Sequence, residues 1–275
     1  MFNGVTALQA QRAGFKALYL SGSGVAGAMA IPDLGITTMS EVVEDARRIV
    51  SVTSVPLITD IDTGFGEALN VARTVRAMES VGVAAVHMED QEMPKKCGHL
   101  SGKRLVGEED MVKKVRAAVE ARHDDDFVII ARTDARAVEG FDGAVRRGRL
   151  YIEAGADMVF PEALESEDEF GMYAKEVKAP LLANMTEFGK SPLIAAGRLG
   201  AMGYRIVIFP LTAFRASLKT TGSIYEGIMR TGSQTGMMDR LMTREDFYKL
   251  IGYHDYERED VKLDEYDTRK KARKE

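Results

Sequence analysis

Short apolar segments alternate with longer amphipathic segments along the chain. Each apolar segment is four to six residues long and apolar at nearly every position. Strands that are covered on both faces, as in a parallel sheet flanked by helices, have this pattern. The predicted strands are residues 17–21, 57–60, 84–88, 127–132, 157–160, 181–184 and 206–209.

The segments between these strands carry apolar residues at helical spacing. Several of them are followed by a glycine (Gly82, Gly155 and Gly203), which is the residue expected just past the end of a helix. The predicted helices are residues 6–13, 40–50, 68–81, 108–122 and 142–154.

Polar residues stand at the carboxyl end of nearly every predicted strand. A chain of alternating strands and helices forms either an open, doubly wound sheet or a closed barrel. In a barrel these strand ends converge on one mouth, where the active site lies, whereas in an open sheet they spread along an edge. We therefore predict an α/β fold of the (β/α)8 TIM-barrel type. The polar strand ends are Ser21, Asp60, Asp62, Glu89, Asp90, Arg132, Asp134, Glu162, Asn184 and Thr186.

The pattern contains seven strands, whereas a TIM barrel has eight. The chain opens at a turn before the helix at 6–13, so we expect the first strand to be missing from this N-terminus and to lie upstream of residue 1. No linker divides the chain, which predicts one barrel domain over 1–275, with 240–275 as a helical, charged extension. The tail from Tyr253 is dense in charge, and we expect it to be solvated or partly disordered.

Composition limits the classes of partner. The net charge of -5 and the isoelectric point near 5.6 argue against nucleic acid or an anionic membrane as the partner. No apolar run approaches the roughly 18 residues that span a bilayer, and no signal peptide is visible. Cys97 is the single cysteine, which excludes a disulfide within the chain and favours a cytoplasmic location.

Acidic residues gather at the predicted mouth. Asp60 and Asp62 are two residues apart and so lie on the same face of their strand, and Glu89 ends the next strand. Carboxylates that share one mouth repel each other unless a cation or a proton intervenes, and an oxygen-only set suits Mg²⁺ or Mn²⁺. Together with Asp33 they predict a metal site, although acids at strand ends can also cap helices. Asp90 is the expected exception, because it points to the opposite side from Glu89.

Cys97 lies in a polar, glycine-containing stretch, residues 94–107, that we interpret as a lid loop above the mouth. Two neighbouring lysines and His99 are expected to favour its thiolate and to make it a group that exchanges protons near neutral pH. The alternative is a buried cysteine that serves only packing. One cysteine and four scattered histidines do not have zinc-ligand spacing.

Cationic and amide side chains complete the predicted mouth. Arginines bind carboxylates with two hydrogen bonds, so Arg132, at a strand end, is a candidate substrate ligand, with a structural ion pair as its alternative. The turn Ser21–Gly24 offers backbone N–H groups to an anionic oxygen. The set predicts a metal-bound polycarboxylate or α-keto acid substrate, whose enolate the metal stabilises and a lid acid protonates. The other candidates are Asn184, Thr186, Arg215 and Arg244.

Ordered motifs over almost the whole chain resemble the isocitrate lyase/phosphoenolpyruvate mutase superfamily, and most closely its methylisocitrate lyase members. The resemblance lies in YLSGSGVA (19–26), PDLG (32–35), DIDTGFG (60–66), HMEDQ (87–91), KKCGH (95–99), ARTDA (131–135), FPEA (160–163), NMTEFG (184–189), FPLTAFRA (209–216) and MTREDFY (242–248).

The resemblance implies a residue role at each matching position. Mg²⁺ is implied on Asp60 and Asp62, with Asp33 and Glu89 contributing mostly through water. Cys97 is implied as the acid, and Tyr19 and Glu162 are the candidates for the base. Substrate contacts are implied for Ser21, Gly22, Ser23, Gly98, His99, Arg132, Asn184, Thr186, Arg215 and Arg244.

The implied reaction is the retro-Claisen cleavage of 2-methylisocitrate to pyruvate and succinate, a step of propionate metabolism. The alternatives are cleavage of isocitrate, dimethylmalate or oxaloacetate, a carboxyphosphonoenolpyruvate mutase, and a non-catalytic barrel that serves binding or assembly. Members of the family are commonly homotetramers that exchange C-terminal helices. Ser23 is a departure, since methylisocitrate lyases often have glycine there, and it narrows the room beside the substrate carboxylate.

Overall fold

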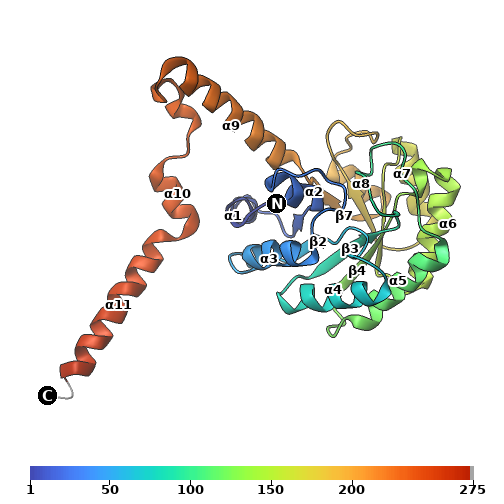
Figure 1. The fold of residues 1–275 in the computed structure, drawn as a ribbon, viewed down its shortest axis with the longest axis horizontal. Helices are drawn as coiled ribbons and strands as arrows, with labels where there is room; N and C mark the ends of the chain where they lie inside the picture. Colours follow the sequence, from blue (N-terminus) through green and yellow to red (C-terminus); the bar gives the residue numbers. More distant parts are fainter. Residues whose placement is uncertain (273–275) are drawn as a thin grey trace. The chain divides into compact units, whose positions relative to one another are not determined.

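The computed structural model describes residues 1–272 and contains a curved sheet of seven parallel strands (Figure 1). The strands are hydrogen-bonded in the order of the chain, from β1 to β7, and form a nearly closed barrel. Each predicted strand is confirmed to within two residues. The strands are β1 (Leu18–Leu20), β2 (Leu57–Asp60), β3 (Ala85–Glu89), β4 (Val128–Thr133), β5 (Met158–Pro161), β6 (Leu181–Asn184) and β7 (Tyr204–Ile208).

Helices follow the strands and cover the outside of the sheet (Figure 1). All five predicted helices are confirmed, and the glycine stops are confirmed as well, because Gly82, Gly155 and Gly203 have φ angles of 84°, 107° and 112°. The helices of the barrel are α1 (Gly4–Arg12), α2 (Gly22–Ala28), α3 (Met39–Val50), α4 (Ala68–Ser80), α5 (Glu108–Ala121), the 3₁₀ turn η1 (Ala135–Ala137), α6 (Gly140–Glu153), α7 (Glu167–Glu176) and α8 (Ala196–Met202).

Alternation along the strands decides which side chains reach the barrel interior. On β4, Ile129 and Ala131 pack against the outer helices, whereas Ile130 belongs to a separate apolar cluster inside the barrel. Residues two apart share a face of a strand, so Arg132 continues the inward row at the mouth. The interior cluster consists of Tyr19, Ile58, Ala85, Ile130, Met158, Phe160, Leu182 and Ile208.

The chain divides into two compact units, Met1–Ala216 and the part that begins at Ser217. The first unit is the barrel. The second contains most of α9 (Thr212–Thr231), followed by the 3₁₀ helix η2 (Thr235–Arg240), α10 (Arg244–Ile251) and α11 (Tyr253–Ala272).

The expectation of a solvated tail is confirmed, because residues 253–264 are exposed, whereas the alternative of partial disorder is wrong for the described residues, which form α11. This segment is rich in Glu, Lys and Arg, which are good helix formers, and it has ion pairs of i,i+3 spacing such as His254–Glu257 at 2.8 Å. The last three residues of the predicted tail lie outside the described residues.

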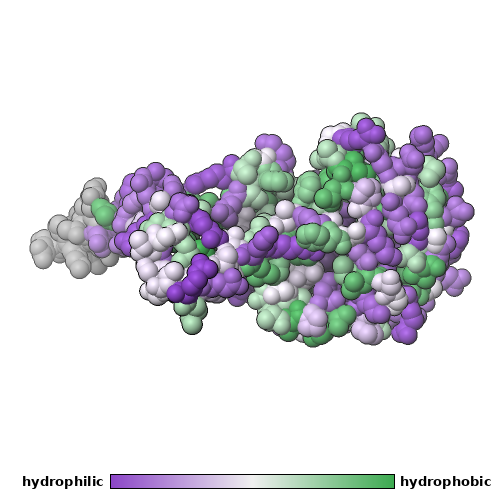
Figure 2. Space-filling view, turned by 90° about the horizontal axis from the view of Figure 1, so that it is seen from above, coloured by the Kyte–Doolittle hydropathy of each residue, from purple (hydrophilic) through white to green (hydrophobic). Residues whose placement is uncertain are grey.

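The visible face in Figure 2 is a mixture of hydrophilic and hydrophobic residues, with the hydrophobic ones in separate patches. Among the described residues, no helix has both the length and the apolar character that a membrane span requires.

Candidate active site

A cavity of about 230 Å³ opens at the carboxyl ends of the strands. Gly22, Asp62 and Glu89 lie beside it, since each contacts a residue of its wall. The predicted site residues of the first unit therefore come together. The residues of the prediction that line the cavity are Tyr19, Ser21, Ser23, Asp33, Asp60, Cys97, Gly98, His99, Arg132, Glu162, Asn184, Thr186 and Arg215.

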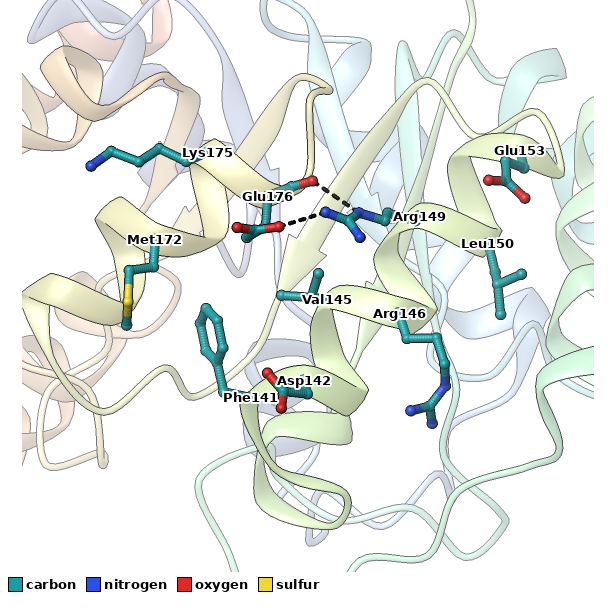
Figure 3. A pocket seen from close by; sticks show the side chains of 10 residues that line it. All are labelled: Phe141, Asp142, Val145, Arg146, Arg149, Leu150, Glu153, Met172, Lys175 and Glu176. Carbon is teal, nitrogen blue, oxygen red and sulfur yellow. Dashed lines mark hydrogen bonds and ion pairs between the residues drawn. The ribbon is translucent and has the colours of Figure 1, made fainter.

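A larger hollow of about 570 Å³ lies on the outside of the barrel, between α6 and α7 (Figure 3). Its surface includes the ion pair between Arg149 and Glu176, whose closest atoms are 2.6 Å apart, and the exposed Met172. None of the strand-end residues reaches it. The smaller cavity at the strand ends is therefore the candidate active site.

Asp60 and Asp62 lie at the floor of this site and are both buried. Asp60 accepts a hydrogen bond of 3.0 Å from the backbone N–H of Gly22, which is therefore occupied rather than free for a substrate oxygen as the sequence suggested. A Cβ atom at Gly22 would lie 3.1 Å from a carboxylate oxygen of each aspartate, so a side chain here would crowd both. Lys95 bridges Asp62, at 2.7 Å, and Asp33.

Burial and neighbouring charges give the carboxyl groups of the site different pKa values. Burial together with the charge of Asp60 raises the pKa of Asp62 to about 6. For Asp60 itself, the cost of burial is outweighed by His87 and Lys95, which lower its pKa to about 2. Burial raises the pKa of Glu89 well above its usual range, although Arg132 opposes the shift.

These residues fit a hydrated Mg²⁺ ion. One carboxylate oxygen of Glu89 has no hydrogen-bond partner in the described structure, and Asp62 ionises only at a cost. Within the described residues, no three His, Cys, Asp or Glu side chains converge to hold a metal directly. Mg²⁺ keeps several waters and usually takes one or two protein carboxylates, so the oxygen donors present suit it.

Arg132 is buried between three carboxylates, in the position where a substrate ligand was predicted. It pairs with Glu89 at 3.1 Å, with Glu162 at 3.3 Å and with Asp134 at 2.9 Å. Its guanidinium also lies over the ring of Phe160, 5.2 Å from the centroid. A cation held in this way has a fixed orientation at the wall of the cavity.

Asp90 is structural, as expected from its direction. Its carboxylate accepts hydrogen bonds from Tyr151, Thr133 and the backbone N–H of Asp134, at 2.7, 2.8 and 2.9 Å. It thereby fixes the end of β4 behind the site.

The lid loop lies against the site with Cys97 on its inner side. The expected thiolate is not favoured in this structure, because burial raises the pKa of the Cys97 thiol. The neighbouring lysines are engaged elsewhere, Lys95 with aspartates and Lys96 with the carbonyl of Gly102. The thiol therefore keeps its proton at neutral pH.

Lid and barrel also meet at His99, which lies 3.0 Å from Glu162 and accepts a hydrogen bond from the backbone N–H of Lys190. Burial disfavours the charged form of Glu162, but Arg132 and His99 outweigh it and lower the pKa of Glu162 to about 2. The amide of Asn184 lies 3.3 Å from the same carboxylate.

The remaining predicted residues of the first unit line the cavity. Arg215 donates to Thr186 at 3.2 Å and pairs with Glu187 at 2.6 Å. Ser21, at the N-cap of α2, and Ser23, on the first turn of this helix, line the cavity. Arg244 is exposed on the first turn of α10 in the second unit, and its substrate role stays a prediction.

Sequence reasoning missed His87, which is completely buried beneath the site. Its ring stacks on Tyr19 and its Nε2 atom lies 2.8 Å from the Tyr19 hydroxyl oxygen. The alternation of side chains along a strand could have identified it, because His87 precedes Glu89 by two residues on β3 and so lies on the same face.

The fold and this site define a class, the (β/α)-barrel enzymes whose chemistry takes place at the carboxyl ends of the strands. The family model for phosphoenolpyruvate phosphomutase matches residues 1–229. The 2-methylisocitrate lyase of Aeropyrum pernix is 57% identical over 263 residues, which cover 96% of this chain and 85% of that protein. That of Shewanella oneidensis is 50% identical, with 93% and 88% covered.

Solved structures agree with the family model. The structure of 2,3-dimethylmalate lyase, a member of the PEP mutase/isocitrate lyase superfamily, has a TM-score of 0.90 and 37% identity over 96% of this chain and 88% of that one. Phosphonopyruvate hydrolase in complex with oxalate and Mg²⁺ has a TM-score of 0.86 and 34% identity, with 95% and 91% covered. This chain therefore belongs to the phosphoenolpyruvate mutase/isocitrate lyase superfamily and is an enzyme, a carbon–carbon lyase.

Proposed function

We propose that the protein cleaves 2-methylisocitrate to pyruvate and succinate, with Mg²⁺ as its cofactor and Cys97 as the proton donor. The observation that carries this proposal is the position of a protonated, single thiol on a lid that faces buried carboxylates and an arginine. The relatives named 2-methylisocitrate lyase support the choice of substrate.

The metal would be held by Asp60 and Asp62, with Asp33 and Glu89 near its waters. When bound, Mg²⁺ supplies positive charge that stabilises the oxyanion of the keto-acid fragment. Lys95 already neutralises part of this cluster and holds the carboxylates in place.

The bond that breaks joins the carbon bearing the hydroxyl to its neighbour. A base takes the hydroxyl proton, the hydroxyl carbon becomes the carbonyl of pyruvate, and the electron pair passes to the neighbouring carbon. Cys97 delivers a proton to that carbon and yields succinate. Because burial raises the pKa of Cys97, the thiol carries this proton at neutral pH.

Of the two candidate bases, Glu162 is the one that is ionised before substrate binds, since Arg132 and His99 hold its pKa near 2 against the effect of burial. Tyr19 has its pKa raised by burial and by Asp60, and so it keeps its proton. Glu162 is therefore free to accept a proton but is a weak base at this pKa, whereas Tyr19 must first lose its own proton, so both residues stay candidates for the base.

The methyl group of the substrate needs an apolar contact. Phe160 and Ile208 close the interior of the barrel below the cavity, and Pro210 and Leu211 line its rim. The similarity to 2,3-dimethylmalate lyase makes dimethylmalate the second candidate substrate.

A cleavage assay tests the proposal. The protein is assayed with Mg²⁺ and with 2-methylisocitrate, isocitrate, 2,3-dimethylmalate or oxaloacetate, as wild type and as Cys97→Ser. We expect 2-methylisocitrate to be the best substrate and the variant to lose about 10²-fold or more in kcat, as for removal of a general acid. Full activity in Cys97→Ser, or no cleavage of any of these acids by the wild type, would contradict the proposal.

The proposal also covers the metabolic pathway, the cellular location and the oligomeric state. We place the reaction in the methylcitrate cycle of propionate metabolism, in the cytoplasm, and we propose a homotetramer that exchanges C-terminal helices.

A further inference from the structure

The backbone on the N-terminal side of Cys97 is bonded to a buried side chain. The amide of Gln91 accepts a hydrogen bond of 2.9 Å from the N–H of Lys96 and donates one of 2.8 Å to the carbonyl of the same residue. Gln91 is 2% exposed, so its amide group is shielded from water. A side-chain amide in this arrangement replaces a neighbouring strand and fixes the backbone in two directions.

The backbone on the C-terminal side of Cys97 has an equivalent contact. The ammonium group of Lys103 donates to the carbonyl of Gly98 and pairs with Asp134 at 2.7 Å. The side chains of Lys103 and Asp134 are 1% and 0% exposed. Burying an ammonium group is costly unless it is paired and hydrogen-bonded, and these two contacts meet that condition.

Asp134 links the lid to the wall of the cavity. Besides Lys103, its carboxylate accepts hydrogen bonds of 2.9 and 3.1 Å from Arg132. A Cβ atom at Gly98 would lie only 2.3 Å from the Cγ of Glu162, so the lid backbone rests directly on the site at this point. The lid position and the arginine position therefore depend on one buried carboxylate.

We propose that Gln91 and Lys103 are positioning residues that clamp the backbone on either side of Cys97 and hold its thiol in the cavity. The effect of the clamp on catalysis rests on the proposed function, whereas the existence of the clamp does not. Neither residue faces the cavity, so both act through Cys97 rather than on the substrate.

The single cysteine makes the clamp measurable without turnover, because a thiol reagent reports Cys97 alone. The test compares the rate of alkylation by iodoacetamide in Gln91→Met, Lys103→Met and the wild type. Arg104→Met is the matched control, since Arg104 is the next cation along the lid but forms an exposed ion pair with Glu92. Circular dichroism and urea unfolding verify that each variant is folded at the assay temperature. If Lys103→Met is unfolded, the alkylation rate of Gln91→Met alone decides the test.

We expect alkylation of Cys97 to accelerate about tenfold or more in both clamp variants and to stay within about twofold of the wild type in Arg104→Met. With 2-methylisocitrate, kcat is expected to fall about tenfold or more in both variants, and KM is expected to change by less than about threefold in Gln91→Met, which leaves Arg132 and its partners in place. Lys103→Arg, which keeps the charge and the donors, is expected to restore part of both effects.

Alkylation rates within about twofold of the wild type in a folded clamp variant would overturn the proposal, whatever the activity. Faster alkylation with unchanged kcat would overturn it as well, since catalysis would then not depend on the clamp. If the wild type cleaves none of the tested acids, the proposed function fails, and the alkylation rates still decide whether the clamp exists.

Discussion

Cys97 shows how burial outweighs neighbouring charge in setting the chemistry of one side chain. In the sequence it stands next to two lysines, which would favour a thiolate. In the structure the lysines point to other partners, and the barrier to ionisation is the loss of water around the sulfur. A reaction that needs a proton donor is better served by this thiol than by a thiolate.

This protonation state gives a pH prediction. Because the pKa of Cys97 lies above the ordinary thiol value of 9.0, the thiolate fraction of the native protein should rise with pH later than that of a free cysteine. We expect the iodoacetamide rate to increase with a midpoint above pH 9 in the native protein and near the ordinary value in urea. Equal midpoints in the two states would contradict a burial effect.

A second prediction at the level of single residues concerns the binding of Mg²⁺ by Asp62. Mg²⁺ that binds only the folded protein stabilises it by about 2.7 kcal/mol at a concentration 100 times Kd. We expect Mg²⁺ to raise the thermal midpoint of the wild type, and Asp62→Asn to lose this shift. Asp125→Asn, an exposed aspartate before β4, is the matched control and should keep it.

The change in stability that Asp62→Asn causes in the absence of metal also has a predicted sign. Burial and the charge of Asp60 raise the pKa of Asp62 from its ordinary value of 3.8 to about 6. The free energy of unfolding therefore falls as the pH rises between these two values. In EDTA at pH 7, Asp62→Asn should therefore be as stable as the wild type or more stable, by up to about 3 kcal/mol. A clear loss of stability in EDTA would contradict the raised pKa of Asp62, which already includes the effect of Lys95.

The loop between β2 and α4 shows what an element requires of its sequence. It contains Asp62 of the site, and Gly64 follows two residues later with a φ of 90°. A Cβ atom here would lie 2.4 Å from Val71 Cγ2 and 3.2 Å from Met88 Sδ. Backbone conformation and close packing both require glycine at this position.

Two alanine substitutions separate these requirements. Gly14 also has a positive φ, 96°, but a Cβ atom added there would meet nothing within 4 Å. We expect Gly14→Ala to lower the free energy of unfolding by about 1 kcal/mol and Gly64→Ala by about 2–4 kcal/mol, measured by urea unfolding. Equal losses would mean that the backbone conformation alone accounts for glycine in the β2–α4 loop.

The elements themselves were predictable because their signals are local. Strand and helix boundaries follow from apolar spacing and glycine stops, and period two places Asp60 and Arg132 at the mouth. The clamps could not be predicted, because the pairing of Lys103 with Asp134 joins residues 31 apart through a fold that must exist first. The state of the thiol depends likewise on how deeply the lid buries it.

At the scale of the whole molecule, the second unit leaves apolar side chains in contact with water. On α9, Leu218, Tyr225 and Met229 are 56%, 65% and 86% exposed. Their spacing of seven and four residues places them on one face of the helix. Monomeric proteins rarely leave such a contiguous face uncovered, so it supports the proposed assembly of several copies.

The assembly is tested by introducing charge on that face. We expect the wild type to run as a homotetramer in size-exclusion chromatography with light scattering, and Tyr225→Glu/Met229→Glu to yield a smaller species at the same concentration. A glutamate in an apolar interface loses its water without gaining a partner, which is costly. Lys219→Glu, an exposed position of the same helix outside this face, introduces a glutamate without removing apolar contact and should keep the tetramer. A wild type that is monomeric, or a double variant that keeps the full mass, would mean that this face of α9 does not form the interface.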